Sequence, residues 1–132
     1  MKRHALAIVL LAGLAAAGCG NEGPVAGELE VRLASPNSDD RAVLFRLIGE
    51  QTALSAPSGS GYRVFHGAPA GDTVRVVVMA PQGGHLAAGP LVRVAVPDTR
   101  AAAAYRAVVQ QVASTAYVPR PTTVYALTVV QP

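Results

Sequence analysis

Two adjacent carboxylates, Asp39 and Asp40, are side chains whose type could hold a metal ion. They follow Asn37 and Ser38, and together these residues offer the oxygen ligands that calcium prefers. Calcium takes about six to eight oxygens, usually from several carboxylates, and the EF-hand spacing is absent. An Asx-type turn explains the same residues. We therefore favour a turn, keep Asp39 and Asp40 as the metal candidates, and expect no cofactor.

Histidine and serine could serve a zinc site or a hydrolase. Neither His66 nor His85 has a second histidine or a free cysteine at ligand spacing. Ser60 lies between two glycines, without the spacing or the strand-turn-helix setting of a nucleophile elbow. Asp72 or Asp98 could complete a triad by count alone. We expect no catalytic residues and no enzyme, and a small exported hydrolase is an alternative.

Tyrosine rings could form a platform for sugar stacking. Sugar-binding faces rely on exposed tryptophan and tyrosine, and this chain has no tryptophan. Half-buried tyrosines are also common in strands, where the ring packs and the hydroxyl finds a partner. A glycan- or cell-wall-binding module is therefore an alternative function. Its candidate residues are Tyr62, Tyr105, Tyr117 and Tyr125.

The chain begins with the parts of an export signal that leads to Cys19, its only cysteine. Met1 to His4 is basic, Ala5 to Ala17 is apolar and uncharged, and Ala15 to Gly18 supplies small residues. The apolar stretch is shorter than the roughly 20 residues of a membrane span. We predict a signal peptide over residues 1–18, with an uncut membrane anchor or a buried helix as the alternative.

The run Ala16-Ala17-Gly18-Cys19 resembles the lipobox of bacterial lipoproteins. It matches at the two small positions and the cysteine, and departs at Ala16, where leucine is usual. The resemblance covers the first 19 residues and implies a diacylglycerol on Cys19, usually with an acyl chain on its amino group. In a Gram-negative cell, Gly20 in place of aspartate implies the outer membrane. Ordinary cleavage after Ala15-Ala16-Ala17 is the alternative, and would leave a secreted domain with a free thiol.

Composition predicts one exported domain after a short linker. Loss of Lys2 and Arg3 with the signal leaves the mature chain close to neutral, and its arginines are spread singly. We therefore expect no nucleic-acid partner. Residues 19–27 combine the lipidated cysteine with a Gly-rich, flexible tether, and residues 28–132 form the domain.

Period-two alternation predicts strands along the whole domain. Leu29, Val31 and Leu33 share one face of the first strand. Two valine-rich strands, 73–79 and 91–96, are expected to pair antiparallel with Arg75 and Arg93 outward. The other expected strands are 42–48, 51–56, 62–66, 105–113 and 122–130.

Residues Thr99–Ala104 follow Asp98 like a helix start. We predict one helical turn there and a strand after it, and a continuous helix over 99–113 is the alternative. Seven or eight short strands favour an all-β, two-sheet sandwich of the immunoglobulin-like type. Residues 42–96 are loosely similar to cohesin-like sandwiches, which implies no site residue here.

The anchor, the short tether and the missing catalytic groups favour a non-enzymatic cell-envelope lipoprotein. We expect its domain to act as a binding or structural module close to a membrane. Its partner would be an envelope protein or a glycan. A protein partner could add a strand to an exposed sheet edge, and the last strand, 122–130, is the edge that we expect.

Overall fold

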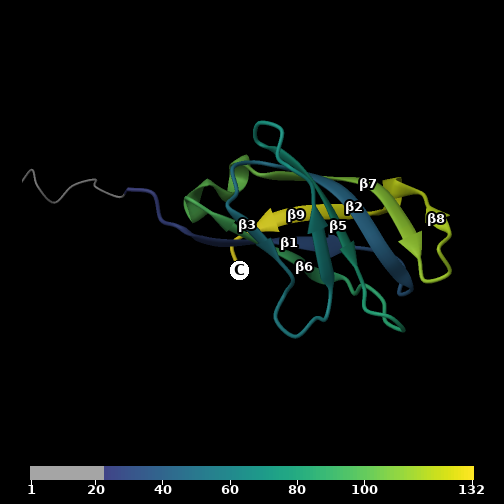
Figure 1. Ribbon diagram of the computed structural model, residues 1–132. Helices are drawn as coiled ribbons and strands as arrows, with labels where there is room; N and C mark the ends of the chain where they lie inside the picture. The colour runs from purple at the N-terminus through teal and green to yellow at the C-terminus, as the bar shows by residue number, and fades with distance from the viewer. Residues whose placement is uncertain (1–22) are drawn as a thin grey trace, which may run out of the picture.

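Alternating apolar side chains build two antiparallel sheets that pack face to face (Figure 1). The computed structural model describes residues 23–132, so the predicted signal peptide and Cys19 lie outside the described residues. One sheet, the β1 sheet, has the order β3 (Ala53–Ser55), β6 (Gly89–Val96), β1 (Gly27–Ala34), β9 (Ala126–Val130). The other, the β2 sheet, has the order β4 (Arg63–His66), β5 (Thr73–Met79), β2 (Asp40–Ile48), β7 (Arg106–Ser114), β8 (Pro119–Arg120). The predicted all-β, two-sheet sandwich is confirmed.

The core lies between the sheets and is built mainly from the inward positions of β1, β2, β5 and β6. Phe45 and Leu47 on β2 are fully buried, as are Leu29 and Val31 on β1. Their neighbours on the same strands point outward, as the period of two requires. Within residues 23–132, no helix is long and apolar enough to span a membrane.

The valine-rich strands β5 and β6 do not pair with each other, so that prediction is wrong. β5 pairs with β2 and β4, whereas β6 pairs with β1 and β3. The two strands lie in opposite sheets and bury their valines in one shared core. Alternation specifies the buried face of a strand and not its neighbour. The connection from Met79 to Gly89 is also much longer than a tight hairpin loop, so it can cross between the sheets.

The predicted helical turn after Asp98 is confirmed as the 3₁₀ helix η2 (Thr99–Ala104), and β7 follows it. The continuous helix over 99–113 is therefore wrong. Asp98 is the N-cap, and its carboxylate accepts a hydrogen bond from the Arg100 amide.

The last strand is shorter than predicted. Thr122–Val124 forms the 3₁₀ helix η3, and β9 begins only at Ala126. Pro121 precedes η3 with its φ at −60°, which is the value that the proline ring fixes and that a helix start accepts. The two-residue strand β8, which pairs with β7, was not predicted.

Gly49 is a position where no other residue fits. Its φ is +136°, and an added Cβ would lie 2.1 Å from Cδ1 of Tyr105. We expect Gly49→Ala to lower the free energy of unfolding by about 3–5 kcal/mol, because backbone strain and overlap add. Gly59→Ala is the control, because Gly59 has φ +75° with no atom within 4 Å, and should cost about 1–2 kcal/mol. Equal denaturant midpoints for the two variants would contradict the close contact with Tyr105.

Candidate functional site

The structure does not bring the predicted hydrolase residues together. His66 is exposed, and its ring Nδ1 lies 3.2 Å from the carbonyl oxygen of Gly67. The Ser60 hydroxyl donates to the carbonyl of Pro57 at 2.8 Å. His85 is exposed in the loop between β5 and β6. In the described part of the chain, no group of three or more His, Cys, Asp or Glu side chains could hold a metal ion.

Asp39 and Asp40 bind protein groups at the turn between β1 and β2. Asp40 is fully buried, and accepts hydrogen bonds from the Ser35 and Tyr125 hydroxyls, each at 2.6 Å. Nη2 of Arg120 donates to both oxygens of Asp39 at 2.6 Å, and its Nε lies 3.6 Å from Asp40. Burial raises the pKa of Tyr125, and the hydrogen bond to Asp40 raises it further. In the loop between β1 and β2 the Asn37 amide donates to the Ser35 hydroxyl at 3.0 Å, so a serine holds the bend in place of the predicted Asx-type turn. Protein donors surround the two carboxylates.

The four tyrosines do not form one platform. Tyr105 and Tyr125 are buried, at opposite ends of the sandwich, and the hydroxyl of Tyr105 donates to the carbonyl of Glu50. Tyr62 is half-buried, and its hydroxyl accepts from the Ala87 amide at 2.9 Å. Tyr117 alone among them is strongly exposed, at 69%, with Arg41 5.8 Å from its ring centroid.

The segment before β1 is held against the loop at Asp98. The Val25 amide donates to the Asp98 carboxylate at 3.3 Å, and the Thr99 amide donates back to the Val25 carbonyl at 2.8 Å. Nη2 of Arg100 reaches the Gly23 carbonyl at 2.7 Å. Residues 23–26 of the predicted tether therefore have fixed contacts on the domain, at the end where η2 lies (Figure 1).

The carboxylate of Asp98 organises this contact. Its pKa lies below the ordinary value, chiefly because the Arg100 side chain donates to it, with further help from the amides of Arg100 and Val25. The charged form is therefore favoured in the folded chain. Its contribution is complete above the ordinary pKa and is lost as the pH falls through the lowered pKa.

The strand β9 ends the β1 sheet, so the predicted position of an edge at the end of the chain is confirmed for Ala126–Val130. One side pairs with β1, and no residue of β9 makes a backbone hydrogen bond to any other strand of the described chain. Its free side faces a groove of about 340 Å³. The groove is lined by Ala102, Ala103, Tyr105, Arg106, Ala107, Leu127, Thr128 and Val129. We call it the β9 groove.

The other edges carry features that discourage strand addition, whereas β9 is covered only in part, because β7 and η2 lie close to it. β3 and β4 are short, β4 carries Arg63, and β8 carries Pro119. Beyond β8, the edge of β7 begins with Arg106 and is interrupted by a bulge at Gln110. Short length, charge, proline and bulges all discourage strand addition. β9 has the uncharged sequence Ala-Leu-Thr-Val-Val, so it is the edge best suited to pair with another chain.

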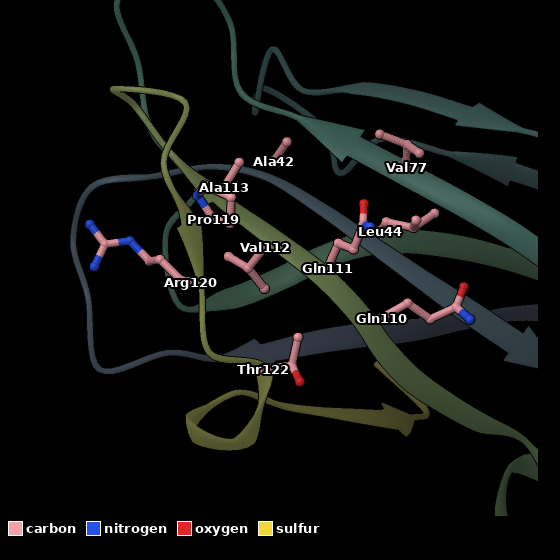
Figure 2. Close-up of a pocket in the computed structure, with 10 residues that line it drawn as sticks. All are labelled: Ala42, Leu44, Val77, Gln110, Gln111, Val112, Ala113, Pro119, Arg120 and Thr122. Atoms are coloured by element: carbon pink, nitrogen blue, oxygen red, sulfur yellow. The ribbon is translucent and has the colours of Figure 1, made fainter.

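A second depression, of about 350 Å³, lies where β2, β7 and β8 meet. Figure 2 shows Leu44 and Gln111 among its lining side chains, with the Arg120 guanidinium directed away from them. Oε1 of Gln110, which also lines the depression, is buried and has no hydrogen-bond partner in the described chain. The depression brings mostly apolar groups together, and its lining includes no acid, histidine or serine.

Comparison with family models, curated proteins and solved structures finds no match to this chain. Its function is therefore argued from its own residues. The arrangement offers a held N-terminal segment and an uncharged strand edge that β7 and η2 partly cover. Among residues 23–132 it brings no metal-binding group together. Sequence reasoning missed the contact of residues 23–26, although it correctly predicted a helical turn that follows Asp98.

We expect Asp98→Ala to release residues 23–26 from the domain. The Thr99 amide should then exchange its hydrogen about fivefold faster or more, because Asp98 no longer holds Val25, whose carbonyl accepts from that amide. In the unaltered chain the same amide should exchange faster, relative to its intrinsic rate, as the pH falls below about 3.8. Asp72→Ala is the control, because Asp72 accepts a side-chain hydrogen bond only from Thr73. Unchanged exchange in Asp98→Ala would show that Asp98 does not hold the segment.

Proposed function

We propose that this chain is a non-enzymatic cell-envelope lipoprotein whose sandwich is held close to a membrane by lipid on Cys19. The attachment of Gly23–Ala26 to the Asp98 loop carries this proposal, together with the export signal and the lipobox-like run. From Gly23 back to Cys19 the chain spans at most about 14 Å. A lipid on Cys19 would therefore keep the η2 end of the domain at the headgroup surface. In a Gram-negative cell, Gly20 favours the outer membrane.

Within this proposal the domain binds a protein partner by strand addition at β9. Support comes from the free side of β9, its uncharged sequence and the β9 groove beside it. An added strand gains main-chain hydrogen bonds, and the groove receives its side chains. The glycan alternative has one strongly exposed tyrosine, Tyr117, to support it, and the hydrolase alternative lacks a serine–histidine contact in the described chain. We therefore rank both below a protein partner.

The intact mass of the protein from its native membranes tests the anchor. We expect the mass of the chain from Cys19 plus two or three acyl chains, because one acyl chain alone binds only marginally. Cys19→Ser is the control and should leave the signal uncut or the mature chain unlipidated. An unlipidated chain that starts at Gly18 would contradict lipidation and show ordinary cleavage after Ala15-Ala16-Ala17.

Crosslinking in intact cells, with mass spectrometry of the captured protein, tests the β9 edge. We expect Thr128→Lys to reduce capture of the main partner about tenfold or more, because a charge on an edge strand opposes pairing. Ser55→Lys is the matched control, since Ser55 is also exposed on an edge strand of the same sheet. Equal capture by the two variants would exclude strand addition at β9.

A further inference from the structure

Three arginines that are far apart in the sequence meet on the outer face of the β2 sheet. Arg46 on β2 and Arg75 on β5 are directly opposite each other in the ladder. Arg106 on β7 lies diagonal to Arg46, because Val108 is the residue opposite Arg46. All three side chains are exposed. We call them the arginine row.

The arginine row has no counter-charge within the described chain. None of its members makes an ion pair or hydrogen bond through its side chain there, and the outward positions of β2, β4, β5 and β7 include no acidic residue. The nearest acids along these strands are Glu50 and Asp72, in the turns beyond Ile48 and Thr73. Like charges directly opposite each other on a sheet are unfavourable. The fold therefore leaves a repulsion that an external anion would relieve.

The opposite face of the sandwich shows the contrast. On the β1 sheet, Arg32 pairs with Glu30, and Arg93 pairs with Glu28. Arginines on that face are thus neutralised within the molecule. The two faces therefore differ in unpaired positive charge, which would orient the domain toward a negatively charged surface.

Apolar groups that are exposed or half-buried lie next to the arginine row on the same face. Phe65, Val77 and Leu44 form one row across β4, β5 and β2, and Figure 2 shows the Leu44 and Val77 side chains on neighbouring strands. Phe65 is 51% exposed, and Val108 beside Arg46 is 37% exposed. Guanidinium groups beside exposed apolar side chains match a lipid interface, where phosphates lie next to the acyl region.

The arginine row also lies near the end of the domain that the anchor reaches. β2 ends two residues after Arg46, β5 begins two residues before Arg75, and β7 begins at Arg106. This is the end at which the N-terminal segment leaves the sandwich beside η2 (Figure 1). A lipid on Cys19 would hold this part of the face within reach of headgroup phosphates.

We propose that the outer face of the β2 sheet docks on an anionic lipid surface, with the arginine row on lipid phosphates and Phe65 at the interface. The inference rests on the proposed lipid anchor, which would bring the domain to the membrane. It further specifies which face of the domain contacts the membrane and that the lipid is anionic. Each arginine near an anionic surface strengthens binding about fivefold. The contact weakens as salt screens it.

Arginine footprinting with phenylglyoxal, read by mass spectrometry, tests the docking. The full mature protein is placed in vesicles of phosphatidylcholine alone or of an equal mixture with phosphatidylglycerol. We expect Arg46, Arg75 and Arg106 to react about tenfold more slowly in the mixture, and high salt to remove the protection. Arg32 and Arg93 on the other face are internal controls and should react equally in both vesicles. No protection, or equal protection of both faces, would overturn the proposal.

Two further arms identify the source of any protection. Inorganic phosphate without vesicles should not protect the arginine row, and protection there would replace the lipid surface with a phosphate-ion site. Protection in intact cells but not in anionic vesicles would indicate an acidic protein and overturn the proposal. The intact mass is read on the same sample, so a chain without lipid is recognised directly. Such a chain is still tested by co-sedimentation with the two kinds of vesicle.

A double variant tests the arginine row itself. Arg46→Gln with Arg75→Gln should abolish the slower reaction of Arg106 in anionic vesicles, whereas Arg32→Gln should leave it unchanged. The double variant removes a like-charge pair, so its thermal unfolding midpoint should not fall. Retained protection of Arg106 in the folded double variant would show that the arginine row does not hold the face to the lipid.

Discussion

The buried carboxylate of Asp40 is the constraint on which one end of the sandwich depends. It has no exposed surface, and a charge without solvent or partners would cost several kcal/mol. Ser35 after β1, Tyr125 before β9 and Arg120 on β8 supply its partners. These residues come from both sheets, so the requirement to pair one charge joins the sheets at this end. It also brings the start of β9 beside the end of β1, where Ala126 is opposite Ala34.

The opposite end is closed by packing and capping instead of a buried charge. The Tyr105 ring lies against Gly49, where even a methyl group would overlap it, and its hydroxyl bonds to Glu50. Asp98 then caps η2 and binds the segment before β1. The two ends therefore have different roles. The Asp40 end joins the two sheets, and the Asp98 end holds the N-terminal segment where it leaves the domain.

Alternation along the sequence predicted the strands well because one face of each strand is buried. It could not predict that β5 and β6 lie in opposite sheets. A strand has the same alternating pattern whichever of the two sheets it belongs to. The partners of Asp40 were also out of reach, because Tyr125 is 85 residues away from it. For the same reason the arginine row was missed. Arginines spaced singly along the chain suggested no cluster, yet strand pairing gathers Arg46, Arg75 and Arg106 on one face.

The surfaces proposed for function share no residue with the Asp40 network, but the β9 groove includes Tyr105, which packs against Gly49 at the opposite end. They meet each other at Arg106, which lines the β9 groove and belongs to the arginine row. A partner strand in the β9 groove and a lipid surface on the outer face of the β2 sheet would therefore both contact the Arg106 guanidinium. Coupling between two binding events is reciprocal. If a bound strand draws Arg106 into the groove, lipid docking loses one of its cations, and lipid docking in turn must oppose that strand to the same degree.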